Sequence, residues 1–486
     1  MSGRWGSLVI LLAVMCGCSP VGPNYTKPDV AVPHQFGSLE SGISTGQEPG
    51  KSYTMSWWTV LEDPMLNSLV ERAIQGNPDM RIVIARVQQA RALSMRADAL
   101  LLPDGGFTGS YQRFRRSESG SSGQSASGGG SSSAADSARE NNLFLAGFDA
   151  SWEIDIVGGL RREIEATDAD LAATEDTLRD TVVTLQGEVA RTYIECRGLQ
   201  LRLEIARREV VTWQENVEIG EARLRAGLIN ELDVTRAKGE LASAQARVPL
   251  LENILLMAVH RLGVLLGLEP FSLQAELRQS VSLPFVPENL PAGLPSDLVR
   301  RRPDIRRAER ELAAATARIG VATADLFPRF SLTGSFGYQA DSFDRLFRDS
   351  ANFWSIGPAV RWPIINFKRI LATIDASKAV REEVLARYEK NILKAFEEVE
   401  NALVNLSREK RRALSLADSV RHNELAVTLA KDRYRAGLAS YLAVLDAEVA
   451  SYTAQDQLAQ SRQNQVLAFV ALYKALGGGW LDYYGE

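Results

Sequence analysis

Few residues in this sequence are placed to do chemistry. The chain of 486 residues has three histidines, His34, His260 and His422, which lie far apart. So scattered a set indicates neither a metal site nor a histidine-based catalytic triad. The run Gly477-Gly478-Gly479 follows an expected helix instead of opening one, so it does not predict a phosphate-binding loop. We therefore expect a protein that is not an enzyme and that holds no metal or cofactor.

The sequence does indicate one chemical modification, the acylation of Cys18. Arg4 precedes an apolar run, residues 8–15, which is too short to span a bilayer and is typical of a signal-peptide core. Cys18 follows a small residue, Gly17, as lipoprotein processing requires. We predict that cleavage leaves Cys18 as the first residue, carrying a diacylglycerol and a fatty acyl chain. The alternative is an ordinary signal peptide that is cut nearby.

Composition excludes several classes of protein. Hydrophobic residues make up 45% of the chain and charged residues 24%, as in folded proteins. The net charge of −5 gives no reason to expect nucleic acid as a partner. No segment downstream of the signal peptide has 18 apolar residues in succession, so a transmembrane helix is not predicted. Cys196 falls at an apolar heptad position, where we expect a buried thiol.

The sequence repeats itself. Trp152 returns 210 residues later as Trp362, and upstream Gly109 returns 225 residues later as Gly334. The first copy therefore has 15 extra residues, within a region that holds a Ser/Gly-rich stretch, residues 117–133. Each copy reads as helix, strand, loop, strand, very long helix, turn and helix. One structural unit thus occurs twice, and the Ser/Gly stretch is predicted to be a flexible loop between two strands.

Each copy is expected to contain one very long helix. Residues 161–226 lack proline, and their apolar residues recur every seven positions in two series offset by four. This pattern favours coiled-coil packing, and a helix of that length measures about 100 Å. The second copy repeats the pattern. Gly227 and Gly437 are predicted to end the two helices, because glycine accepts the left-handed conformation of a helix stop. Each return helix and the short helix before the strands should stack end to end beside a long helix.

The period changes to two between Pro103 and Gly158 and between Pro328 and Phe367, and we predict two strands in each region. Residues 144–154 alternate apolar and polar side chains, and so do residues 330–338 and 354–364. Such alternation over about ten residues, with aromatic residues near the ends, is typical of a membrane β-barrel wall. The alternative is a half-buried sheet of a soluble domain. Because four strands cannot close a barrel in lipid, several copies must pool their strands, and a through-channel indicates three or more.

The sequence resembles the TolC-type outer-membrane factors, specifically the NodT-type lipoprotein branch that serves RND tripartite efflux pumps. The motifs that carry the resemblance are, in chain order, Val21-Gly22-Pro23-Asn24-Tyr25, Trp57-Trp58, Asp63-Pro64-Met65-Leu66, Leu294-Pro295-Ser296-Asp297-Leu298, Arg300-Arg301-Arg302-Pro303-Asp304-Ile305, Phe327-Pro328, Leu332-Thr333-Gly334-Ser335-Phe336-Gly337 and Tyr473-Lys474-Ala475-Leu476-Gly477-Gly478-Gly479-Trp480. They span the whole mature chain.

The resemblance implies a fold class that is mainly α with a transmembrane β part. It implies a homotrimer in the outer membrane, in which a 12-stranded β-barrel with four strands per chain continues into a long periplasmic α-helical barrel. The implied partners are outer-membrane lipid, a periplasmic adaptor (membrane fusion protein) and an inner-membrane RND transporter. The implied function is a passive exit duct for drugs or other small toxic compounds.

The resemblance also indicates which residues act at the periplasmic end. The helix tips are expected to dock onto the adaptor; their candidate residues are Arg225, Gly227, Leu228, Arg435, Gly437 and Leu438. Asp432, one turn before the second tip, is the candidate for an acidic ring at the periplasmic aperture. The alternative for Asp432 is a solvated surface carboxylate beside Arg433.

Other functions remain open at this point. Within the duct class, the chain could serve a type I protein secretion system or heavy-metal efflux. Outside it, the chain could be a structural lipoprotein whose coiled coils only bridge membranes, although the amphipathic strands argue against that. The expected segments are 1–17 (signal peptide), 18–56 (extended N-terminal segment), 57–105 (first-repeat helices), 106–157 (first β-hairpin with the Ser/Gly loop), 158–268 (first long helix and return helix), 269–302 (connector), 303–327 (second-repeat helix), 328–367 (second β-hairpin), 368–476 (second long helix and return helix) and 477–486 (C-terminal tail).

Overall fold

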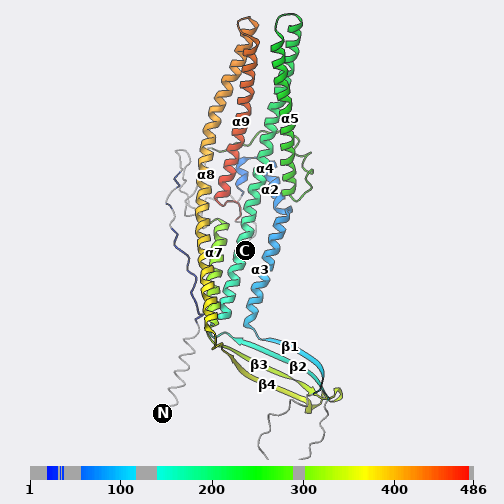
Figure 1. Ribbon diagram of the computed structural model, residues 1–486, viewed down its shortest axis with the longest axis vertical. Helices are drawn as coiled ribbons and strands as arrows, with labels where there is room; N and C mark the ends of the chain where they lie inside the picture. The colour runs from blue at the N-terminus through cyan, green and yellow to red at the C-terminus, as the bar shows by residue number, and fades with distance from the viewer. Residues whose placement is uncertain are drawn as a thin grey trace, which may run out of the picture. The chain divides into compact units, whose positions relative to one another are not determined.

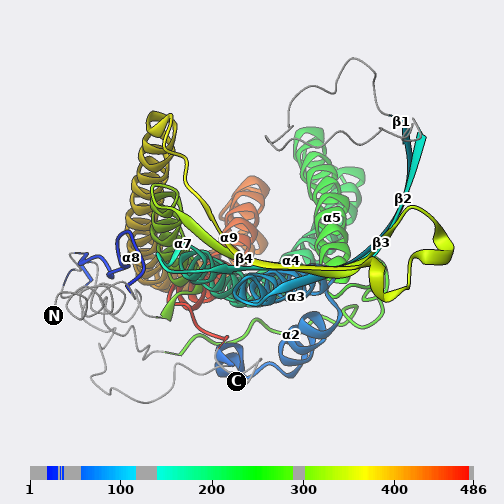
Figure 2. The same cartoon turned by 90° about the horizontal axis from the view of Figure 1, so that it is seen from below.

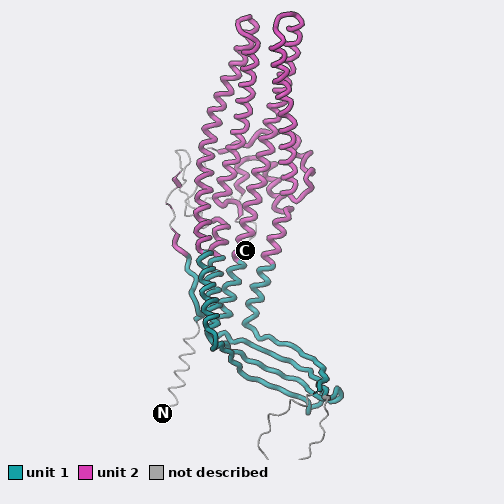
Figure 3. Tube along the Cα trace, viewed as in Figure 1, with its two compact units in different colours: residues 1–27, 89–171, 311–384 teal, residues 28–88, 172–310, 385–486 magenta. Residues whose placement is uncertain are grey.

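The computed structural model describes residues 19–30, 33, 36–37, 56–115, 140–287 and 301–480. The predicted signal peptide with Cys18 and the Ser/Gly stretch lie outside these residues. The chain divides into two compact units (Figure 3). Unit 1 comprises residues 1–27, 89–171 and 311–384, and unit 2 comprises residues 28–88, 172–310 and 385–486.

Unit 1 contains one four-stranded antiparallel sheet in the order β1-β2-β3-β4. Figure 2 shows that the sheet is curved. The strands are β1 (Asp104–Arg115), β2 (Glu140–Ile154), β3 (Arg329–Ala340) and β4 (Asn352–Arg361). Short 3₁₀ turns flank them, namely η2 (Ala99–Leu101), η3 (Phe343–Arg345) and η4 (Asp349–Ala351). All four predicted strands are therefore present, and they pair in sequence order.

Segments of four helices complete unit 1. These helices are α3 (Pro78–Asp98), α4 (Gly159–Arg225), α7 (Pro303–Ala324) and α8 (Phe367–Arg435). Ser94 of α3 donates a hydrogen bond of 2.7 Å to Asp168 of α4. Arg318 of α7 forms an ion pair with Asp170 of α4, and Ala322 of α7 packs with Ile370 of α8. Side by side, the helices thus follow the order α3, α4, α7, α8.

Unit 2 holds two long helical hairpins (Figure 1). α4 turns back into α5 (Glu231–Leu265), and α8 turns back into α9 (Tyr441–Ala475); η1 (Trp57–Leu61) and α2 (Pro64–Gly76) also belong to this unit. Trp213 of α4, Ala237 of α5 and Tyr441 of α9 share one buried cluster. Cys196 is fully buried, and burial raises the pKa of its thiol to about 12. The heptad interpretation and the buried thiol are thus confirmed.

Within unit 2 each short helix begins where a return helix ends. The Asn77 side chain, at the start of α3, donates a hydrogen bond of 2.8 Å to the Leu265 carbonyl at the end of α5. In the second repeat, Arg302 donates one of 2.9 Å to the Ala475 carbonyl at the end of α9. The predicted end-to-end stacking is confirmed. One boundary differs slightly: α7 ends at Ala324, whereas the predicted second-repeat helix continued to residue 327.

Several of the sequence motifs meet in one buried cluster of unit 2. The ring of Trp57 stacks on that of Tyr473, with centroids 5.6 Å apart. Gln186 of α4 donates a hydrogen bond of 2.8 Å to the Gly479 carbonyl. The guanidinium of Arg306 lies 5.1 Å from the centroid of Trp480. Trp57, Tyr473 and Trp480 are therefore packing residues, and they join the start of the first repeat to the C-terminal motif.

One described helix, α5, is long and apolar enough to cross a membrane by length and composition alone. No such helix was predicted from the sequence, because α5 lacks an uninterrupted run of 18 apolar residues. Most residues of its apolar part are not buried. Leu250 and Met257 are more than half exposed. A single copy of the chain thus leaves much of the apolar surface of α5 uncovered.

Candidate functional site

The sheet of unit 1 presents an exposed aromatic face. Phe107, Phe148, Phe336 and Trp354 are successive partners across β1 to β4. Their side chains are 51–71% exposed. Large apolar side chains in such numbers are not left in water, and on a sheet they mark contact with a partner or with lipid.

The opposite face of the same sheet is polar. Thr108 donates a hydrogen bond of 3.0 Å to Asp149 of the neighbouring strand. The hydroxyls of Ser335 and Ser355 lie 2.8 Å apart. The alternation predicted from the sequence is thus confirmed, with one face suited to lipid and the other to water.

Two tryptophans mark the ends of the strands next to the helices. The indole of Trp152 donates a hydrogen bond of 2.9 Å to the Leu101 carbonyl. In the second repeat, Trp362 donates one of 3.1 Å to the Leu326 carbonyl. Their rings are 38% and 52% exposed. An apolar ring with a satisfied N–H suits the boundary between lipid and water.

The sheet has two open edges. β1 and β4 are the outer strands, and each is paired on one side only within the described residues. Unpaired backbone groups cannot face lipid. If the aromatic face lies in a membrane, other strands must cover both edges.

The helix tips predicted from the sequence are two matching turns in unit 2. Gly227 and Gly437 have positive φ angles of 69° and 70°. After each glycine, the next amide donates back to the last helical turn, from Leu228 to the Arg223 carbonyl and from Leu438 to the Arg433 carbonyl. These are Schellman turns, which glycine accepts without strain. A Cβ atom at either glycine would meet nothing within 4 Å, so the backbone is open to a partner.

The leucine after each glycine points into solvent. Leu228 is 73% exposed and Leu438 is 70% exposed. Arg225 and Arg435, at the ends of their helices, are also exposed. Each tip therefore combines an apolar side chain, a cation and an accessible backbone.

Asp432 lies on the surface one turn before the second tip. Its carboxylate is 3.3 Å from the guanidinium of Arg435, and the two side chains are 62% and 72% exposed. The carboxylate is solvated, as in the alternative from the sequence, and its ion pair joins it to Arg435, one helical turn away. An exposed pair of this kind adds little stability, so the carboxylate can exchange partners readily.

Sequence reasoning missed a buried polar cluster next to the tips. Glu448 of α9 is 2% exposed, accepts a hydrogen bond from Asn216 of α4 and lies 2.7 Å from the ammonium of Lys431 of α8. The Tyr441 hydroxyl donates a hydrogen bond of 3.1 Å to the Asn216 carbonyl. The cluster ties the two hairpins together. A charged residue within the apolar pattern of α9 was the signal that could have revealed it.

A second missed feature is a clamp on the N-terminal segment of unit 1. The Arg162 side chain is 3% exposed and donates to three backbone carbonyls, including that of Val21 at 2.9 Å, and to Asn24 at 2.6 Å. Gly320 lies against this side chain, because a Cβ there would be 2.7 Å from Arg162. The chain two residues beyond Cys18 is thus held firmly against α4 and α7.

We expect Arg162→Ala to release this segment. Its loss removes charge-assisted hydrogen bonds and leaves partly buried carbonyls without donors, which should cost about 3 kcal/mol. Limited proteolysis should therefore cut within residues 19–27 about 100-fold faster than in the wild type. Arg91, an exposed residue of α3 in the same unit, provides the control Arg91→Ala. Equal cleavage rates for Arg162→Ala, Arg91→Ala and the wild type would contradict the clamp.

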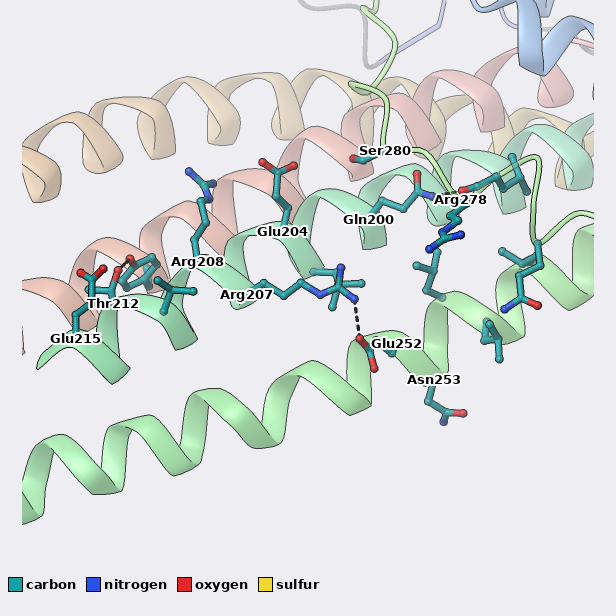
Figure 4. Close-up of a pocket in the computed structure, with 18 residues that line it drawn as sticks. Gln200, Glu204, Arg207, Arg208, Thr212, Glu215, Glu252, Asn253, Arg278 and Ser280 are labelled. Carbon is teal, nitrogen blue, oxygen red and sulfur yellow. Dashed lines mark hydrogen bonds and ion pairs between the residues drawn. The ribbon is translucent and has the colours of Figure 1, made fainter. Parts of the chain in front are cut away.

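A surface groove of about 1130 Å³ lies between α4, α5 and the chain after α5. Figure 4 shows Arg207 of α4 reaching Glu252 of α5, and the pair is 2.7 Å apart. Thr212 and Tyr452, which also line the groove, share a hydrogen bond of 2.6 Å between their hydroxyls. Among the residues that the structure describes, no group of histidine, cysteine and carboxylate side chains could hold a metal ion.

The chain is similar in sequence and in structure to known proteins. The chain matches the family model described as "Outer membrane efflux protein" over residues 69–268 and 294–478. It is 31% identical to "Nodulation protein T" of Rhizobium leguminosarum bv. trifolii, over 96% of both chains. It is 35% identical to "Pyoverdine export outer membrane protein OpmQ" of Pseudomonas putida, over 87% of this chain and 88% of that relative. The solved structure of the outer-membrane channel OprN has a TM-score of 0.86 and 35% identity, over 95% of this chain and 99% of that one.

Proposed function

The chain belongs to the outer membrane efflux protein family, and from that premise we propose that it forms the outer-membrane exit duct of a tripartite pump. Membership confirms the expected fold class, the location in the outer membrane and a transport function instead of catalysis. The observation that carries the proposal is the aromatic face of the unit 1 sheet, backed by a polar face and bounded by two open edges. Such a sheet suits the wall of a water-filled channel.

The duct is a homotrimer. Three copies pool twelve strands, which is enough to enclose a channel, whereas the eight strands of two copies would leave an interior filled by side chains. The exposed apolar side chains of α5 support association, because further copies would cover them. In the membrane, outer-membrane lipid contacts the aromatic face.

Acylation of Cys18 anchors each copy to the same membrane. The Arg162 clamp supports this, since it holds the chain two residues after the acylated position. Labelling with a radioactive or clickable palmitate should mark the wild type and not Cys18→Ser.

The tips dock onto a periplasmic adaptor, which links the duct to an inner-membrane RND transporter. Leu228 and Leu438 would enter apolar pockets between adaptor helices, and the bare backbone at Gly227 and Gly437 permits close approach. We expect the double variant Leu228→Arg, Leu438→Arg to lose most efflux while the amount of assembled protein stays unchanged. Co-purification with the adaptor and accumulation of a fluorescent substrate would measure this. Normal efflux in that variant would exclude the docking role.

The cargo is a small toxic molecule or a secreted metabolite. The export of pyoverdine named for one relative favours small molecules over proteins. Type I protein secretion and heavy-metal efflux are the alternatives. A strain that lacks the chain should become sensitive to organic toxicants and recover on complementation. Sensitivity to metal salts alone, or loss of one secreted protein alone, would favour the corresponding alternative.

Asp432 contributes to the resting closure of the periplasmic aperture. Three copies bring three carboxylates around one axis, where they attract cations and respond to them. We expect Asp432→Ala to make the closed channel leakier, seen as a higher resting conductance and higher uptake of large antibiotics. Glu424 is an exposed carboxylate that precedes Asp432 in α8 and lies farther from the tip, and it provides the control Glu424→Ala. Unchanged conductance and unchanged antibiotic sensitivity in Asp432→Ala would exclude this role.

A further inference from the structure

A small pocket of about 260 Å³ lies in unit 2, where α9 ends and α7 begins. Its walls come from α4, α7, α8 and the end of α9, and most of its lining is polar. Four cations and three carboxylates line it, namely Arg302, Arg307, Lys394 and Lys474, and Asp180, Asp304 and Glu398. Four positive charges against three negative charges leave an excess of positive charge, so the pocket as a whole attracts anions.

Arg302 engages two of the three carboxylates. Its guanidinium lies 2.7 Å from Asp304 and 2.7 Å from Glu398. It also donates a hydrogen bond of 2.9 Å to the Ala475 carbonyl. Arg302 thus fixes the positions of both carboxylates, and its own hydrogen bonds are used within the protein.

The two lysines of the pocket are held only loosely. The ammonium of Lys394 lies 3.7 Å from Glu398, and that of Lys474 lies 4.0 Å from Glu188. An ammonium that donates to a carboxylate lies about 2.7–2.9 Å from it, so both distances are too long for hydrogen bonds. Glu188 is meanwhile 2.9 Å from Arg191. Both lysines can therefore donate to a ligand without breaking a hydrogen bond among the described residues.

The pocket opens on one face of the helices, and segments from the two ends of the chain lie on the other. On α4, Gln186 binds the C-terminal motif, whereas Thr184 lines the pocket. On α8, Glu400 accepts a hydrogen bond from the Gly37 amide, whereas Glu398 lines the pocket. Two positions on a helix are about 200° of rotation apart, so the two side chains of each pair point to opposite sides.

The N-terminal segment identifies the outer face. This segment follows Cys18, and the proposed acyl chains of Cys18 lie in lipid, which surrounds the barrel from outside. The segment cannot cross a closed wall of helices, so the face that holds Gly37 is the outer face of the duct. The pocket, on the opposite face, therefore lines the interior, once in each copy.

We propose that this pocket binds the anionic group of a molecule that passes through the duct, with Lys394 and Lys474 as the donors. The inference rests on the proposed duct and names the class of its cargo, small organic molecules that carry a carboxylate or a phosphate. Sites that enclose a drug-sized molecule measure about 300–1,000 Å³, so this smaller pocket takes the charged group alone. Because the lysines are 66% and 41% exposed, water competes for them and the cargo can leave again.

Asp180 limits how tightly an anion binds. Its carboxylate lies 3.5 Å from Arg307 and lines the same pocket, where it repels a second negative charge. Burial, and after it the charge of Asp304, raise the pKa of Asp180. This carboxylate therefore accepts a proton more readily than an ordinary aspartate, and an entering anion favours that uptake. Removing its charge should strengthen the binding of anions, which a purely structural set of ion pairs does not predict.

Fluorine NMR of the purified trimer in detergent tests the site, with para-fluorobenzoate as the carboxylate probe and monofluorophosphate as the phosphate probe. Lys394→Gln and Lys474→Gln should each lower the affinity about tenfold, because each removes one charge-assisted hydrogen bond. Asp180→Asn should raise the affinity severalfold. Lys410, an exposed lysine of α8 that does not line the pocket, provides the matched control Lys410→Gln.

The outcomes of the NMR experiment are distinct. Binding of either probe that weakens in both lysine variants, strengthens in Asp180→Asn and stays unchanged in Lys410→Gln supports the site. The probe that binds more tightly then identifies the preferred anionic group. Equal binding by the wild type and both lysine variants overturns the site, and so does a wild type that binds neither probe. Equally tight binding of para-fluorobenzamide, the uncharged analogue, overturns the recognition of charge.

Reversal potentials in a planar bilayer separate this inference from the duct itself. Under a gradient of sodium benzoate, the double variant Lys394→Gln, Lys474→Gln should pass less benzoate relative to sodium than the wild type, because each copy loses two positive charges from the wall. Current with an unchanged reversal potential in the double variant overturns the cargo class and leaves the duct. The absence of any current in the wild type contradicts the duct.

Discussion

Phe336→Arg should prevent the chain from assembling in the outer membrane. Phe336 lies near the middle of β3, between Phe148 and Trp354 on the aromatic face, and is 51% exposed. An arginine that faces lipid at mid-depth costs about 2–4 kcal/mol. Three copies would share one barrel, so the total cost reaches about 6–12 kcal/mol, comparable with the stability of a whole domain. Membrane fractionation and the yield of trimer measure the loss.

The neighbouring residue supplies the control. Ser335 is adjacent in β3 but belongs to the polar face, where its hydroxyl contacts Ser355. Ser335→Arg places the same charge toward water and should assemble almost as well as the wild type, with altered ion selectivity. Equal assembly defects in Phe336→Arg and Ser335→Arg would mean that the aromatic and polar faces have the same surroundings.

Arg302→Ala should cause the second large loss, through unfolding of unit 2. The Arg302 guanidinium is 2.7 Å from both Asp304 and Glu398 and also donates to the Ala475 carbonyl. Its side chain is 9% exposed. Removing it leaves two carboxylates and a carbonyl without their donor, which should cost about 3–5 kcal/mol. Denaturant unfolding in detergent would measure the loss. Arg310→Ala, at an exposed position of α7, should stay within about 0.5 kcal/mol of the wild type.

The ion pair of Arg302 with Asp304 also makes the stability of the protein sensitive to acid. Burial raises the pKa of Asp304, but the hydrogen bond and charge of Arg302 outweigh burial, so the pKa lies below its usual value. A lowered pKa in the folded state stabilises the protein above about pH 4, and that contribution is lost as the pH falls further. In Arg302→Ala the loss between pH 4 and pH 2 should be smaller. An unchanged pH profile would show that Arg302 does not control this carboxyl.

Much of the fold could be predicted because the sequence is periodic. Heptad spacing predicted the long helices, alternation predicted the four strands, and the repeat predicted that both halves share a plan. Gly227 and Gly437 could be identified as helix stops because glycine alone adopts their conformation without strain. The helices, strands and helix stops depend on neighbours in the sequence, and the repeat depends on two stretches of the sequence that match each other.

The features that were missed depend on residues far apart in the chain. Arg162 reads as one of many charged residues on a helix, yet it binds carbonyls about 140 positions earlier. Glu448 reads as a solvated carboxylate, yet it is buried against two other helices. The charge of Glu448 within the apolar pattern of α9 was a signal that this position is unusual. Local pattern does not identify the partners of either residue, because those partners are known only once the packing is known.

Single-channel recording in a planar bilayer tests the central claim most directly. Purified chain that assembles as proposed should produce discrete, ion-conducting steps of current. Ser335→Arg adds a positive charge to the polar face and should therefore change the cation selectivity of these steps. Folded, membrane-inserted protein that passes no current, in the wild type and in Asp432→Ala alike, would contradict a duct built from pooled strands.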